Sequence, residues 1–188
     1  MLDKTIEDLT EKLAPVTPLR HPVLRILPYI LLSVVYISAV IAFLGVRKDF
    51  ELKIEEPEYL FELSVSMIAS VTAFICAAYA SVPGMRQKSW LFYIPLISAG
   101  VLLLWLTTLV ITKGFGQTPV DMTECIRDGV LFCVIPTTFL VFMIRKGATT
   151  HPYKAAFSAA LASTFIGWTG LRIICSLDQM AHVMITQV

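Results

Sequence analysis

The sequence predicts an all-α membrane protein, a polytopic helical bundle with five complete transmembrane helices and the start of a sixth. Hydrophobic residues make up 56% of the 188 residues, and the mean hydropathy is +0.75. Charged residues account for only 15%, whereas a soluble domain usually contains about 25%. The net charge of +1, without a basic cluster interleaved with aromatic residues, argues against a direct nucleic-acid partner.

Residues 1–26 are the only sizeable polar part of the chain, and we expect them to form a cytoplasmic segment ahead of the bundle of residues 27–188. An apolar stripe at helical spacing predicts a short amphipathic helix; it consists of Leu2, Ile6, Leu9 and Leu13. Three prolines, which fix φ and restrict the preceding residue, then predict an extended linker. The segment is either a plain tail or a docking helix for a partner.

Five apolar runs follow: Leu27–Val46, Tyr59–Val82, Leu91–Ile111, Val130–Ile144 and Ala155–Cys175. Each run is a candidate transmembrane helix, because about 20 residues cross the hydrocarbon core. Residues Cys125–Gly129 extend the fourth run at its front, and the short connections predict antiparallel neighbours. Met180–Val188 begins another apolar run, which either continues into a sixth helix or lies at the interface; we favour the sixth helix.

The basic residues of the loops predict a cytoplasmic N-terminus. On that side lie Lys4, Lys12, Arg20, Arg25, Arg86, Lys88, Arg145, Lys146 and Lys154. The other side holds Arg47, Lys48, Lys53, Lys113, Arg127 and Arg172. Nine basic residues against six favour this orientation, and the loops Pro83–Trp90 and Arg145–Lys154, both free of acidic residues, support it. Cys125 and Cys175 then lie at the outer face.

The four cysteines fall into two groups. Cys76 and Cys133 sit deep in apolar runs, as small core residues often do. Cys125 opens the fourth helix and Cys175 closes the fifth, so antiparallel packing places both thiols at one membrane level. In an oxidising compartment such a pair can form a disulfide or bind a soft metal ion. His182 is a candidate third metal ligand, and no resident cofactor is predicted.

Small residues recur along the fifth helix at spacings of three and four: Ala155, Ala156, Ser158, Ala159, Ala160, Ala162, Ser163, Gly167 and Gly170. Such spacing lets helix backbones approach closely, so we expect this helix to be central and packed against the fourth. That packing would bring Cys175 towards Cys125 for reasons independent of the thiols.

Charges near the membrane interior are few. Glu62 and Arg172 lie closest to it, within about a turn of the outer interface, and we expect both side chains to snorkel to water. An ion or proton pathway is therefore disfavoured. The sequence also contains no Cys-x-x-Cys, no phosphate-binding loop and no His-Glu-x-x-His pattern.

Several short segments resemble one family: Leu13-Ala14-Pro15-Val16 with Pro18-Leu19, Leu44-Gly45-Val46-Arg47-Lys48-Asp49, Ala80-Ser81-Val82-Pro83-Gly84, Cys125 with Pro136, Arg145-Lys146-Gly147-Ala148-Thr149 with Pro152, and Cys175 with Asp178 and His182. They resemble the NrsF-like anti-sigma factors of the bacterial inner membrane, negative regulators of an extracytoplasmic-function sigma factor F. The resemblance covers nearly the whole chain. The sixth helix of the family is largely missing from this sequence, and Cys133 offers a second thiol on the fourth helix.

The resemblance implies six transmembrane helices with both termini cytoplasmic, and an N-terminal segment that holds a sigma factor at the membrane. It implies that two outward-facing cysteines, matched by Cys125 and Cys175, release the sigma factor under metal or oxidative stress. We therefore expect a multi-pass regulator that is not an enzyme, with a sigma factor and the lipid bilayer as partners. A heavy-metal ion would bind the cysteine pair only transiently. Two alternatives are a small membrane thiol-disulfide oxidoreductase and a non-catalytic transport or assembly subunit.

Overall fold

The computed structural model describes residues 22–82, 90–114, 123–147, 149 and 151–176. Within these ranges the regular elements are helices: α2 (Pro22–Leu44), α3 (Phe50–Ile54), α4 (Pro57–Ala80), α5 (Tyr93–Lys113), α6 (Thr123–Arg145) and α7 (Pro152–Ile174). Five of them are long and apolar enough to cross a membrane. The predicted all-α bundle with five such helices is confirmed, whereas the predicted N-terminal amphipathic helix and sixth helix lie outside the described residues.

Proline sets the start of several helices. Pro57 and Pro152 occupy the first turn of α4 and α7, and α2 begins at Pro22. Proline suits this position, because its φ is helical and its missing N–H would have no intrahelical partner there. The short helix α3, which is not among the helices predicted from the sequence, fills the connection between α2 and α4.

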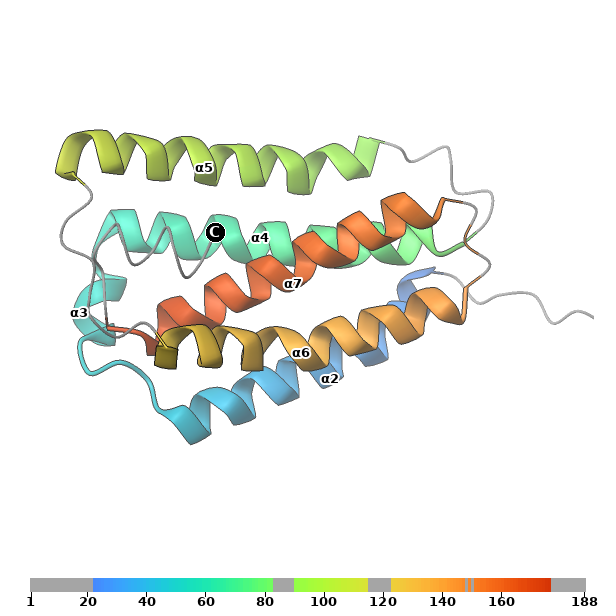
Figure 1. Ribbon diagram of the computed structural model, residues 1–188, viewed down its shortest axis with the longest axis horizontal. Coiled ribbons are helices and arrows are strands. Elements are labelled where there is room, and N and C mark those ends of the chain that lie inside the picture. The colour runs from blue at the N-terminus through green and yellow to red at the C-terminus, as the bar shows by residue number, and fades with distance from the viewer. Residues whose placement is uncertain (1–21, 83–89, 115–122, 148, 150, 177–188) are drawn as a thin grey trace, which may run out of the picture.

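Helix α7 is the centre of the bundle. It packs mainly against α4 and α6, while α5 packs on α4, and α2 packs on α6 and α4 (Figure 1). In its most apolar stretch 61% of α7 is buried, against 17–39% in the other four long helices. Its small side chains explain this position, since Ala155, Ala162 and Gly167 are buried against neighbouring helices. The expectation of a central fifth transmembrane helix thus agrees with the packing.

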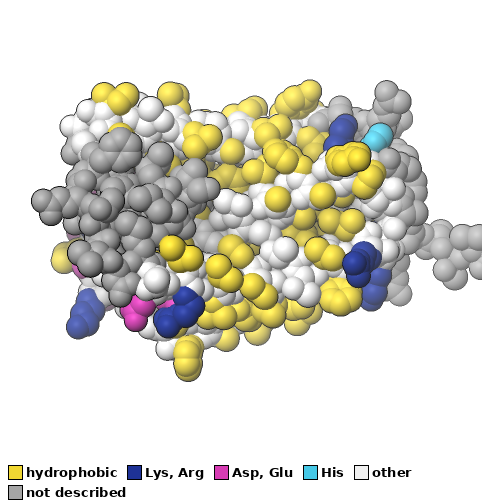
Figure 2. Space-filling model, in the orientation of Figure 1, with side chains coloured by type: hydrophobic (Ala, Val, Ile, Leu, Met, Phe, Trp, Pro, Cys, Tyr) yellow, Lys and Arg dark blue, Asp and Glu magenta, His cyan; other side chains and the backbone are white. Residues whose placement is uncertain are grey.

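The surface matches a protein surrounded by lipid. Figure 2 shows hydrophobic side chains over the middle of this face and charged side chains towards its two ends. Large apolar side chains such as Phe43, Leu104 and Ile111 are exposed on α2 and α5.

We call the end that carries α3, the start of α6 and the end of α7 the thiol end; α2 begins at the opposite end (Figure 1).

Candidate functional site

The thiol end brings Cys125 and Cys175 together. Their sulfur atoms are 2.9 Å apart, and the two cysteines are partly buried and not joined by a disulfide. Cys125 lies in the first turn of α6. Cys175 follows the last residue of α7, in an extended conformation, and its N–H donates to the carbonyl of Leu171 over 2.8 Å. Two residues fifty positions apart therefore form one pair.

A regular series of contacts between α6 and α7 sets the position of this pair. The facing residues, from the thiol end inward, are Cys125 with Cys175, Gly129 with Leu171, Cys133 with Gly167, and Thr137 with Ser163. Each step of four residues along α6 is matched by a step of four in the opposite direction along α7. The thiol pair is thus the last rung of what we call the α6–α7 ladder.

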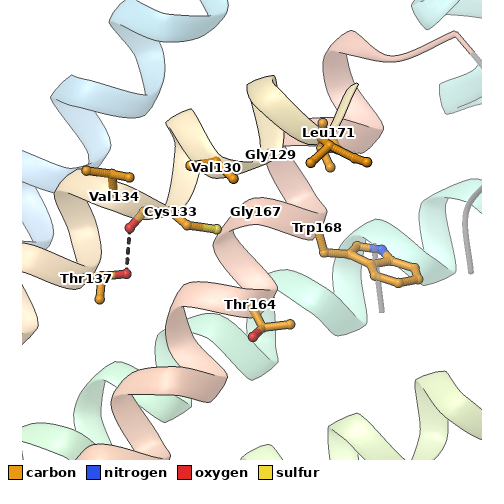
Figure 3. A pocket seen from close by; sticks show the side chains of 10 residues that line it. Gly129, Val130, Cys133, Val134, Thr137, Thr164, Gly167, Trp168 and Leu171 are labelled. Carbon is orange, nitrogen blue, oxygen red and sulfur yellow. Dashed lines mark hydrogen bonds between the residues drawn. The ribbon is translucent and has the colours of Figure 1, made fainter. Parts of the chain in front are cut away.

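Glycine residues let α6 and α7 approach each other closely along the ladder. A Cβ atom on Gly167 would lie 2.5 Å from the sulfur of Cys133, and a Cβ atom on Gly170 would lie 2.6 Å from the ring of Phe132. The Thr137 hydroxyl lies 2.6 Å from both the carbonyl oxygen of Cys133 and the hydroxyl of Ser163. Cys133, Thr137 and Gly167 also line a hollow of about 520 Å³ between α6 and α7 (Figure 3). Cys133 is therefore packed against α7, about two turns from the thiol pair.

A buried ion pair lies one turn from Cys175. The guanidinium of Arg172 is 2.8 Å from the carboxylate of Glu62, and the two side chains are only 8% and 3% exposed. The indole N–H of Trp105 also donates to Glu62, over 3.2 Å. The expectation that Glu62 and Arg172 snorkel to water is therefore wrong: α4 and α7 pack face to face, so each charge finds its partner inside the bundle.

Tyr59 and Arg47 surround this ion pair. The Tyr59 hydroxyl donates to the carbonyl of Arg172 over 2.7 Å, and the Arg172 guanidinium carbon lies 5.0 Å from the centre of the Tyr59 ring. The Arg47 side chain is fully buried and makes two hydrogen bonds of 2.7 Å to Asp49. These bonds to the guanidinium lower the pKa of Asp49 to about 2. The sequence alone did not single out Arg47 or Tyr59 as site residues.

The remaining predicted site residues are distributed as follows. Cys76 is buried and donates its thiol hydrogen to the carbonyl of Leu91 over 3.1 Å. Among the described residues no three His, Cys, Asp or Glu side chains group together as metal ligands. The proposed third ligand, His182, lies outside the described residues, so metal binding by Cys125, Cys175 and His182 stays a prediction. The predicted sigma-factor anchors are also outside them: Leu2, Ile6, Leu9 and Leu13.

A family model described as negative regulator of sigma F, NrsF, matches residues 9–185, nearly the whole chain. The chain belongs to the NrsF family. The resemblance inferred from the sequence is thereby confirmed, and membership supports a role as a negative regulator of a sigma factor rather than as an enzyme. No curated protein and no solved structure matches the chain. The NrsF match spans α2 to α7 and therefore includes α6, α7 and the thiols of Cys125 and Cys175.

Proposed function

We propose that this NrsF protein is an anti-sigma factor of the bacterial inner membrane that releases its partner when the Cys125–Cys175 pair reacts. Residues 1–25 would bind an extracytoplasmic-function sigma factor on the cytoplasmic side, with Leu2, Ile6, Leu9 and Leu13 as the apolar anchors. The observation that carries the proposal is the 2.9 Å separation of the Cys125 and Cys175 sulfur atoms at the thiol end of a chain in this family.

Two reactions are open to the pair, and both change its geometry. A peroxide can take two electrons and two protons from the thiols, leaving a disulfide and, from hydrogen peroxide, two water molecules. The sulfur atoms would then close from 2.9 Å to about 2.0 Å. A soft metal ion instead displaces both protons, and two thiolates at about 2.3 Å on a tetrahedral ion lie about 3.8 Å apart.

Because the glycine contacts hold α6 and α7 close together, we expect a change at the last rung to be passed along the two helices. A Cβ atom at Gly129, Gly167 or Gly170 would lie within 2.9 Å of a side chain of the facing helix, so α6 and α7 are in close contact at these three positions. Release needs only a modest change in binding free energy, since about 1.4 kcal/mol alters affinity tenfold. We therefore expect a small displacement of the helix ends to be sufficient for release.

The N-terminal part of the proposal is tested by capture of the sigma factor from native membranes. We expect the full chain to co-purify with a sigma factor and a chain lacking residues 1–25 to lose it. Undiminished capture by the shortened chain would refute the assignment of the binding segment.

The sensing part is tested with thiol variants under peroxide or cadmium exposure. We expect Cys125→Ser with Cys175→Ser to keep the sigma factor bound under stress, whereas the matched control Cys76→Ser releases it as the parent does. Release from the double variant at the parent's level would remove the thiol pair from the mechanism. Intact-mass measurement then separates the two chemistries, because a disulfide lowers the mass by two hydrogens and a bound ion raises it.

A further inference from the structure

The carbonyl groups at the end of α7 are capped by residues from elsewhere in the chain. The last four carbonyls of a helix have no intrahelical partner. Two of the last carbonyls of α7 accept hydrogen bonds from outside the helix. The Arg172 carbonyl accepts from the Tyr59 hydroxyl over 2.7 Å, and the Ile173 carbonyl accepts from the backbone N–H of Arg47 over 3.2 Å. The end of α7 is thus held by α4 and by the segment that follows α2.

This cap is largely buried and strongly polar. Tyr59 is 2% exposed, and the Arg47 and Arg172 guanidinium groups lie 5.9 and 5.0 Å from the centre of its ring. Hydrogen bonds and ion pairs are stronger where water is excluded, so the cap holds the end of α7 firmly to α4 and to the segment after α2. Glu62 and Asp49 fix the two guanidinium groups in place.

The cap lies directly beside the thiol pair. Ile173 and Arg172 are two and three residues before Cys175, whose backbone has already left the helical conformation. A reaction that draws Cys175 towards Cys125 or away from it therefore displaces the two carbonyls that Arg47 and Tyr59 bind.

Arg47 passes such a displacement to α2. Only Gly45, at φ +87°, and Val46 separate it from the end of that helix. Farther along α2, the Tyr36 hydroxyl donates to the carbonyl of Leu131 on α6 over 2.7 Å. Helix α2 is therefore tied to α7 at the thiol end and to α6 near its middle. Near its start α2 also contacts α6, where the Arg25 guanidinium donates to the Met143 carbonyl over 3.4 Å. A shift of α7 against α6 would therefore tilt α2 about its contacts with α6, and residues 1–21 join α2 at the end that carries Arg25.

We propose that Arg47 and Tyr59 are positioning residues that couple the state of the Cys125–Cys175 pair to the tilt of α2, and through it to the N-terminal segment. This inference rests on the proposed function, since it takes the thiol pair as the input. It adds the route: the backbone N–H of Arg47 and the hydroxyl of Tyr59 connect the last carbonyls of α7 to the segment after α2 and to α4.

The test is hydrogen exchange of the full chain in phospholipid nanodiscs, with thiols reduced or oxidised by hydrogen peroxide. Oxidation should speed exchange of the Arg47 amide by roughly tenfold, because its bond to Ile173 is lost. The Cys125→Ser variant should show no change with peroxide. An unchanged Arg47 amide in a sample whose disulfide is verified by mass would overturn the inference.

A second variant isolates the coupling at Tyr59. Tyr59→Phe keeps the ring but removes the donor, so the disulfide should still form while the peroxide-induced change in exchange at residues 22–30 falls several-fold. The matched control is Tyr93→Phe, an exposed tyrosine at the start of α5. An undiminished change at residues 22–30 in Tyr59→Phe would also contradict the inference.

The readout contains no sigma factor, so it fails or succeeds separately from the proposed function. Loss of thiol-dependent sigma release would refute the function while leaving the exchange result standing. A null exchange result beside normal thiol-dependent release would refute only this route.

Discussion

The hydroxyls of Thr137 and Ser163 lie 2.6 Å apart, three rungs along the α6–α7 ladder from the thiol pair. This contact and the Cys133–Gly167 contact share one register with Cys125 and Cys175. The thiols therefore meet because two helices are aligned over about three turns, and the packing that aligns them can be tested separately from the thiols.

Gly167→Ala should disrupt that alignment. The added methyl would lie 2.5 Å from the Cys133 sulfur, and overpacking of this kind costs about 1–3 kcal/mol. We expect a lower unfolding temperature in detergent and slower disulfide formation between Cys125 and Cys175. Both should recover in Gly167→Ala with Cys133→Ala, because the obstructing sulfur is removed. Gly100→Ala is the control, since nothing lies within 4 Å of its added methyl; equal effects at both glycines would contradict close packing at Gly167.

Glu62→Gln should destabilise the bundle strongly. It leaves the buried Arg172 guanidinium without its carboxylate, and breaking a buried pair by removing one partner costs about 3–5 kcal/mol. Unfolding in denaturing detergent, followed by circular dichroism, measures the loss. A double variant with Arg172→Gln should be more stable than Glu62→Gln alone. Parental stability of Glu62→Gln would mean that the ion pair has no structural role.

Disulfide formation should be confined to one pair. Peptide mapping after mild peroxide treatment of the folded chain should find Cys125 linked to Cys175, because their sulfur atoms are 2.9 Å apart. Cys76 and Cys133, whose thiols donate to backbone carbonyls inside the bundle, should remain alkylatable after unfolding. A dominant link involving Cys133 would show that Cys125 is not the reactive thiol on α6.

The Arg47–Asp49 contact should give an acid-dependent stability. The folded pKa of Asp49 is lowered to about 2, whereas an unfolded aspartate titrates near about 3.9. A group with a lowered folded pKa stabilises the fold above its unfolded pKa, and this contribution is lost as the pH falls towards the folded pKa. Asp49→Asn should therefore be less stable than the parent above about pH 4, with the difference shrinking towards pH 2 in thermal unfolding. A difference independent of pH would contradict the contact.

The sequence was sufficient to predict the five long apolar helices, because a run of about 20 apolar residues crosses a lipid bilayer as an α-helix. The central place of α7 followed from its small residues, and the approach of Cys125 to Cys175 followed from antiparallel neighbours. Hydropathy locates a charge along a helix but not the direction in which it faces, which is why the burial of Glu62 and Arg172 was missed.

The finer parts of the site depend on register. Cysteine, glycine, cysteine and threonine at steps of four along α6 face a matching series on α7, and this spacing was visible in the sequence. Which residue of one series meets which residue of the other was not, since that depends on loop geometry and on side-chain fit. The contacts of Arg47 with Ile173 and of Tyr59 with Arg172 join segments more than a hundred residues apart and have no local signature.

Glu62 and Arg172 carry opposite charges and lie within 2.8 Å of each other, so a movement of the thiol end that keeps them paired carries no net charge from this pair through the bilayer field. A membrane potential acts on a moving unit charge with about 2.3 kcal/mol per 100 mV, but on this neutral pair it exerts almost no net force. A displacement of this pair would therefore respond little to a change in membrane potential.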